Sequence, residues 1–141
     1  MENIVPYNNT NLYAEIKHLI EEARKQVVRS VNSAMVFRLR KIEMTDYLKN
    51  TTETLQKLKP TLANLYNVST IGLFGSIVRD DFMPETSDVD IVVNFIQPIG
   101  IEFVNLSSLL EKELDRKVDL VSLNGIKSKY FQEIEKDIVY V

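Results

Sequence analysis

The sequence predicts a mixed α/β (α+β) chain, in which a long N-terminal α-helix precedes a small mixed β-sheet. Within the first 43 residues, apolar residues recur at helical spacing from Leu12 to Ala34, which is typical of an amphipathic helix. Three later stretches are rich in β-branched and aromatic residues, and helical patterns separate them. We therefore expect an N-terminal helix over residues 1–43 and a folded body over residues 44–141.

Each element follows from its own local pattern. The first helix is expected from Asn11 to about Lys41, because its apolar residues recur every three or four positions from Leu12 to Ala34. Thr45 is a suitable N-cap for a second helix, and Pro60 is expected to interrupt that helix and to begin a short one.

The remaining elements are shorter. Strands are predicted at residues 68–74, 88–95 and 117–123, with a short strand at 138–141, and helices are predicted at residues 101–116 and 125–136.

Composition excludes several classes of protein. The 141 residues include no cysteine and one histidine, which excludes disulfides, thiolate metal sites and clusters of histidine ligands. The net charge of −3 makes direct nucleic-acid binding through phosphate contacts a poor expectation. The start of the sequence lacks the pattern of a secretory signal, and no apolar run approaches the length of a membrane span. We expect a cytoplasmic protein.

Two carboxylates open the second predicted strand. Asp88 and Asp90 are two positions apart, so both side chains point to one face of that strand. Two like charges held this close raise each other's pKa, and a divalent cation between them removes the penalty. Asp119 lies within an apolar run in the third predicted strand, and if this strand is next to the second, the three carboxylates meet at one edge.

A candidate anion site comes shortly before this pair. Gly75 follows the first predicted strand and allows a sharp turn close to a ligand. Ser76 adds a hydroxyl and begins a helical turn, and Arg79 offers a guanidinium that suits phosphate. Because an anion site and a cation site lie about a dozen residues apart, their natural joint ligand is a nucleoside triphosphate with Mg²⁺.

Together these motifs resemble the minimal nucleotidyltransferase family, the small relatives of DNA polymerase beta. The resemblance covers residues 44–141 and is carried by Gly75-Ser76, by Ser87-Asp88-Val89-Asp90 and by Asp119. It implies the mixed-sheet nucleotidyltransferase fold, two Mg²⁺ ions (or Mn²⁺) and transfer of a nucleoside monophosphate, AMP from ATP, to an acceptor. Asp88, Asp90 and Asp119 would be the catalytic metal ligands, and Gly75, Ser76, Arg79 and Ser87 would bind the nucleotide.

One departure from the family pattern concerns the residues after Arg79. The family commonly has glycine there, whereas this chain has Asp80 and Asp81. These two negative charges either weaken binding of a triphosphate or point into solvent.

The size of the body suggests what the acceptor is. Relatives of this minimal size often neutralise a helical HEPN-type toxin by adenylylating it, so we expect an antitoxin that modifies a partner protein. A catalytically weak module that binds nucleotide and masks its partner is one alternative. A small-molecule transferase of the antibiotic-resistance kind is the other.

The first helix has a separate resemblance, to the helical region that precedes PD-(D/E)XK-type nucleases. The residues that carry it run from Tyr13 to Met35, but no nuclease carboxylates follow them. We therefore expect only an amphipathic helix, which packs on the body or on a second copy of the chain in a homodimer.

Overall fold

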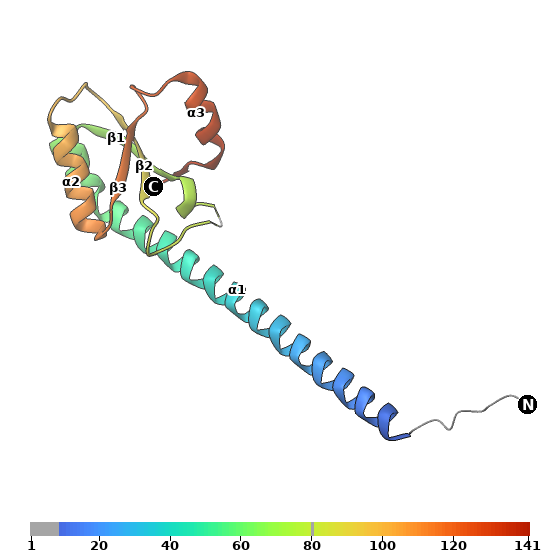
Figure 1. Ribbon diagram of the computed structural model, residues 1–141. Coiled ribbons are helices and arrows are strands. Elements are labelled where there is room, and N and C mark those ends of the chain that lie inside the picture. The colour runs from blue at the N-terminus through green and yellow to red at the C-terminus, as the bar shows by residue number, and fades with distance from the viewer. Residues whose placement is uncertain (1–8, 80) are drawn as a thin grey trace, which may run out of the picture. The chain divides into compact units, whose positions relative to one another are not determined.

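The computed structural model describes residues 9–79 and 81–141, with side chains described from residue 12. Its elements, in chain order, are α1 (Asn9–Tyr66), β1 (Val68–Phe74), the 3₁₀ turn Gly75–Ile77, β2 (Val89–Phe95), α2 (Glu102–Leu114), β3 (Val118–Ser122), α3 (Ser128–Ile134), the 3₁₀ turn Glu135–Asp137 and β4 (Val139–Tyr140) (Figure 1). The contacts divide the chain into two compact units, residues 1–40 and residues 41–141. Within the described ranges, no helix combines the length and apolarity that a membrane crossing requires.

The four strands form one mixed sheet with the order β3-β2-β1-β4. Strand β1 pairs antiparallel with both β2 and β4, whereas β2 pairs parallel with β3. Helix α2 is the crossover that the parallel pair requires. The predicted mixed sheet is confirmed, and its second and third strands are neighbours.

The core of the second unit lies between one face of the sheet and two helices. Leu55 and Leu62 of α1 and Leu106 and Leu110 of α2 are fully buried against the strands. Figure 1 shows α2 and the later turns of α1 on the same side of the sheet, with α3 on the other. The later part of α1 is therefore an integral part of the body's core.

Helix α1 corrects two of the sequence predictions, because it is continuous over 58 residues. Thr45 does not cap a second helix: its hydroxyl donates a hydrogen bond to the carbonyl of Lys41, one turn earlier, at 2.9 Å. Pro60 lies inside α1 without ending it. Although proline in a helix interior costs about 3 kcal/mol, the fully buried Leu55 and Leu62 hold the turns on both sides of it against the core.

The last predicted helix was also too long. Helix α3 begins at Ser128, because the N–H of Gly125 closes a turn on the carbonyl of Ser122 at 3.1 Å. It ends at Ile134 and continues only as the 3₁₀ turn Glu135–Asp137.

The division of the chain generates a prediction about truncation. We expect residues 41–141 to fold cooperatively without residues 1–40, since the buried part of α1 is retained. A fragment that begins at residue 67 should remain unfolded, because it lacks Leu55 and Leu62. Urea melts followed by circular dichroism test both fragments.

Single substitutions provide a matched control for this prediction. Leu55→Ala should lower the free energy of unfolding by about 2–5 kcal/mol, because Leu55 is fully buried. Val36→Ala should change it by less than about 0.5 kcal/mol, because Val36 is 51% exposed. Equal effects of the two substitutions would show that the first unit belongs to the same core.

Candidate active site

The turn after β1 brings a carboxylate against a glycine. Gly75 has a φ of +71°, a left-handed conformation that favours glycine. A Cβ atom at this position would lie 2.0 Å from Oδ2 of Asp90, so there is no room for any other residue. The register of β1 with β2 causes this contact, because it pairs Phe74, the residue before Gly75, with Asp90.

The parallel pairing of β2 with β3 brings a second carboxylate to the same place. Asp90 is directly paired with Asp119, and Asp88 comes just before β2. Asp90 is half-buried, whereas Asp88 and Asp119 are exposed. The second and third predicted strands are therefore neighbours, and they bring Asp90 and Asp119 together; that all three carboxylates form one site stays a prediction.

The pKa of Asp90 is raised above its ordinary value. Burial of the carboxylate is the largest cause, and the negative charges of Asp119 and, more weakly, Asp88 add to it. The backbone N–H of Ser76 donates a hydrogen bond to this carboxylate, and the positive charge of Arg79 also favours its charged form; both oppose the rise. Asp90 is therefore a carboxylate whose charge the apo protein only partly compensates.

These carboxylates have the oxygen donors that Mg²⁺ prefers. Within residues 9–79 and 81–141, however, no three acidic or histidine side chains stand close enough together to form a ready-made metal site. The donor chemistry fits a divalent cation, and the uncompensated negative charge around Asp90 would favour one.

The guanidinium of Arg79 is paired with a neighbouring acid. Its Nε lies 3.3 Å from Oδ1 of Asp81, and its Nη2 lies 3.4 Å from Oδ2 of the same side chain. This ion pair raises the pKa of Arg79. Asp81 therefore faces the arginine that was predicted to bind phosphate. Asp80, the other acidic residue after Arg79, lies outside the described residues.

The two serines make local contacts. Ser76 lies in the 3₁₀ turn beside Asp90 and is half-buried. The hydroxyl of Ser87 accepts a hydrogen bond from the N–H of Met83 at 2.9 Å, and the N–H of Ser87 donates to the carbonyl of Met83 at 2.8 Å. Ser87 thus closes the turn that leads into Asp88, and its role in nucleotide binding stays a prediction.

Sequence reasoning missed a residue that holds this loop in place. The guanidinium of Arg116 lies over the ring of Tyr47, 4.7 Å from its centroid, and 5.5 Å from the ring centroid of Phe82. It also donates a hydrogen bond to the carbonyl of Pro84. Because these contacts join residues far apart in the chain, no local pattern in the sequence signals them.

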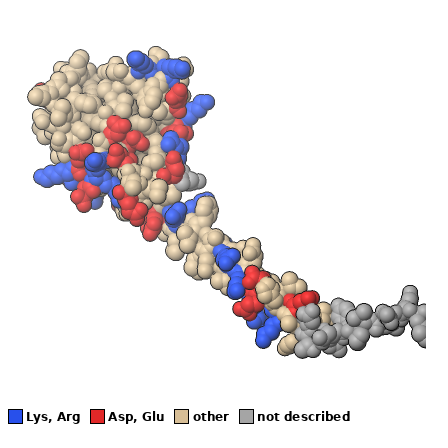
Figure 2. All heavy atoms as spheres, in the orientation of Figure 1, with Lys and Arg blue, Asp and Glu red and all other residues tan. Residues whose placement is uncertain are grey.

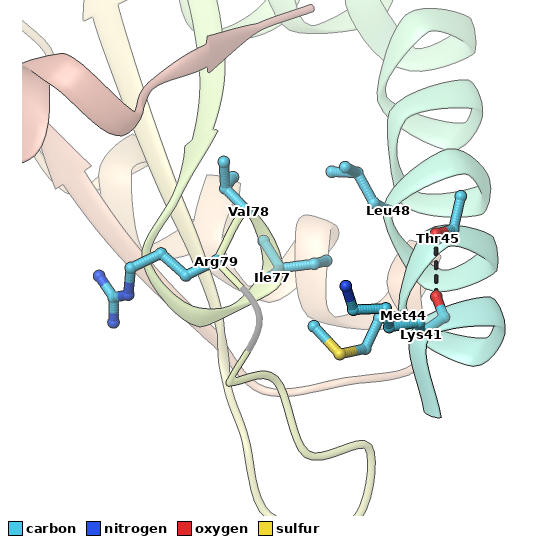
Figure 3. Close-up of a pocket in the computed structure, with 7 residues that line it drawn as sticks. All are labelled: Lys41, Met44, Thr45, Leu48, Ile77, Val78 and Arg79. Carbon is cyan, nitrogen blue, oxygen red and sulfur yellow. Dashed lines mark hydrogen bonds between the residues drawn. The ribbon is translucent and has the colours of Figure 1, made fainter. Parts of the chain in front are cut away.

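A pocket lies behind the glycine-serine turn. Its volume is about 300 Å³, and its walls come from the body's part of α1 and from the end of the turn (Figure 3). Met44, Leu48, Ile77 and Val78 make the lining largely apolar. Figure 3 shows the side chain of Arg79 extending away from α1, so its guanidinium points out of this pocket.

Charges of both signs are mixed on the displayed face of residues 41–141. Figure 2 shows acidic and basic side chains interspersed there, without one continuous basic area. Nucleic-acid binding usually requires such a basic area.

Comparison with known proteins identifies the family. Residues 56–140 match the family model described as "Polymerase beta, Nucleotidyltransferase". The chain belongs to this nucleotidyltransferase family. The matched residues include Gly75-Ser76, Ser87-Asp88-Val89-Asp90 and Asp119. Nucleotidyltransferases of this fold generally use divalent metal ions.

One relative of this chain has a more specific name than the family. The chain is similar to protein adenylyltransferase MntA of Thermococcus cleftensis, with 39% identity over 84 residues, which are 59% of this chain and 84% of that protein.

Solved structures give the same fold. One is described as a crystal structure of a toxin–antitoxin with AMP-PNP; it has a TM-score of 0.54 and 26% identity over 64% of this chain and 71% of its own. Another, of a mutant toxin–antitoxin MntA-HpeT, has a TM-score of 0.53 at 23% identity over 64% and 70% of the two chains, and shows the fold alone.

The contact between Gly75 and Asp90 generates a second prediction. Gly75→Ala should lower the free energy of unfolding by about 1–2 kcal/mol for the left-handed backbone alone, and its methyl group should also displace the carboxylate of Asp90. Gly125→Ala is the matched control, since a Cβ there would meet only the Ser122 carbonyl at 3.8 Å. If the two substitutions have the same effect in urea melts, the close approach at Gly75 is wrong.

The raised pKa of Asp90 generates a third prediction, on stability against pH. A folded-state pKa above the unfolded one means that stability is lost as pH rises through the interval between them. In EDTA, Asp90→Asn should therefore be more stable than the native chain at neutral pH, and this gain should disappear at acidic pH below the ordinary aspartate pKa. Thermal melts over a pH series measure it, and a variant destabilised at neutral pH would contradict it.

Proposed function

We propose that this chain is a protein adenylyltransferase that transfers AMP from ATP to a partner protein of a toxin–antitoxin pair. The observation that carries the proposal is the carboxylate of Asp90, which the sheet holds against the Gly75 turn with Asp119 beside it. The relative named protein adenylyltransferase MntA and the toxin–antitoxin structure with AMP-PNP support the same nucleotide and the same kind of acceptor. The family resemblance implies a HEPN-type toxin as that acceptor.

The residues of the site have distinct roles in this proposal. Asp88 and Asp90, with Asp119, would hold the divalent cation, Mg²⁺ or Mn²⁺, which supplies charge neutralisation at the phosphates when bound. Asp119 would also orient the acceptor hydroxyl and receive its proton. The acceptor oxygen forms a bond to the α-phosphorus of ATP as the bond to pyrophosphate breaks.

The anion side of the site would hold the departing pyrophosphate. Arg79 would pair with the β- and γ-phosphates through its guanidinium, and the Gly75-Ser76 turn allows the backbone to approach them. Catalysis would consist mainly of positioning and charge stabilisation. Because the reaction consumes ATP, we place the protein in the cytoplasm.

One observation favours the alternative of a partner-masking module with weak catalysis. Asp81 already pairs with Arg79, and the Ser76 N–H already donates to Asp90, so both candidate phosphate contacts are engaged. Turnover requires these groups to change partners, whereas masking does not.

Intact-mass analysis of the partner protein decides between the two. The genomic partner is incubated with this chain, ATP and Mg²⁺, and an added AMP mass is expected. Asp90→Asn should reduce the transfer by orders of magnitude, while Asp46→Asn, an exposed carboxylate on α1, is the control that should leave it unchanged. An unmodified partner that still binds this chain would support masking and contradict the proposal.

A fourth prediction concerns nucleotide binding. ATP should raise the melting temperature only when Mg²⁺ or Mn²⁺ is present, because the carboxylates of the site repel an uncompensated triphosphate. Differential scanning fluorimetry with ATP, with and without EDTA, measures this. Equal stabilisation in EDTA would contradict a metal-dependent site.

A fifth prediction concerns the ion pair at Arg79. Asp81→Asn should lower the KM for ATP about two- to fivefold, because it releases Arg79 from an exposed ion pair. Arg79→Ala should raise the KM. An unchanged KM in Asp81→Asn would show that Asp81 and the triphosphate do not compete for this guanidinium.

A further inference from the structure

The helix of the first unit presents an apolar stripe to solvent. The stripe consists of Ile16, Leu19, Ala23, Val27, Val31 and Ala34, which are all exposed. The larger members are 47–66% exposed. A helix face of this kind requires a covering surface, because burying it releases apolar area from water.

The spacing of the stripe is symmetric along the chain. The successive steps from Ile16 to Ala34 are 3, 4, 4, 4 and 3 residues, so these six positions are symmetric about position 25; Leu12 extends the stripe beyond this set, and its mirror position is Arg38. A second copy of the helix laid antiparallel about that position brings these six positions into register as matched layers. Ile16 then lies opposite Ala34 of the second copy, Leu19 opposite Val31, and Ala23 opposite Val27.

This arrangement also matches side-chain sizes. In the first and third of these layers a larger side chain lies opposite alanine, which is the complementarity that close packing requires. A parallel pair would instead place alanine opposite alanine at positions 23 and 34 and isoleucine opposite isoleucine at position 16, so its layers would alternate between gaps and crowding.

The charge distribution favours the same orientation. Residues 12–22 carry three glutamates and one lysine, whereas residues 24–40 carry five arginines and lysines and no acidic residue. In a parallel pair the two basic segments would lie side by side and repel. In an antiparallel pair each basic segment lies along the more acidic segment of the other copy.

The length of the helix agrees with this register. A pair centred on position 25 aligns residue 9, where α1 begins, with residue 41 of the other copy, where the second unit begins. The overlap therefore uses the whole helix of the first unit.

We propose that the first unit is a dimerisation helix whose apolar stripe packs antiparallel on the same stripe of a second copy of this chain. This interaction surface is independent of the transferase chemistry.

Sedimentation equilibrium of the full chain tests the stoichiometry. The native chain should be a dimer, and Val31→Glu, which places a charge in the stripe, should be a monomer with an unchanged melt of the body. Val36→Glu is the matched control, since Val36 is as exposed as Val31 but lies outside the stripe; it should remain dimeric. A monomeric native chain, including one whose helix binds only a different protein, overturns the proposal, and so does a dimer that persists in Val31→Glu.

Cysteine cross-linking tests the orientation without interference, because the chain has no cysteine of its own. After oxidation, a mixture of Leu19→Cys and Val31→Cys chains should give a disulfide-linked heterodimer, and Leu19→Cys alone should give none. Cross-linking of Leu19→Cys to itself would show a parallel pair and overturn the antiparallel arrangement.

Discussion

The register of β2 between its two neighbours is the constraint on which the site depends. Pairing with β1 places Asp90 opposite Phe74, immediately before the Gly75 turn, and pairing with β3 places Asp90 opposite Asp119. A shift of one residue in either pairing would turn Asp90 to the opposite face of the sheet. The buried residues on both sides of Asp90, Val89 and Ile91, prevent that shift, because it would move them out of the core. The hydrophobic core therefore fixes the position of the carboxylate.

The same core holds in place an electrostatic arrangement that is unfavourable in the apo protein. Asp90 is partly desolvated beside other carboxylates, which raises its pKa, and the basic side chain predicted for the site is exposed and paired with Asp81. An arrangement of this kind persists only where the surrounding structure holds it, and it is stabilised when a cation or a cationic group binds. Arg116 contributes to the same support, because it contacts the ring of Phe82 and the carbonyl of Pro84. These contacts hold the loop between the Gly75-Ser76 turn and the Asp88 and Asp90 pair.

The parts of this fold that depend on local pattern could be predicted from the sequence. Strand β1 was predicted to the residue, whereas the sequence left open whether the strands of Asp90 and Asp119 are neighbours, which the parallel pairing of β2 with β3 establishes. The continuity of α1 could not be predicted, because Thr45 and Pro60 carry local signals for a helix boundary that tertiary packing overrides. The pairing of Arg79 with Asp81 and the stacking of Arg116 depend on side-chain geometry, and sequence spacing alone does not determine that geometry.

The two halves of α1 show how one helix serves two purposes. In the second unit, apolar residues of α1 recur at steps of three, four or seven residues and belong to the body's hydrophobic core or pack against it: Met44, Leu48, Leu55, Leu58 and Leu62. In the first unit a stripe of the same periodicity continues along the helix, but its residues are exposed within the part of the chain that the structure describes. A continuous helix gains most of its stability from the packing of its apolar face. The covered half secures α1 to the body, and in the proposed dimer the other half would gain the same kind of packing from a second copy without any change in the active site.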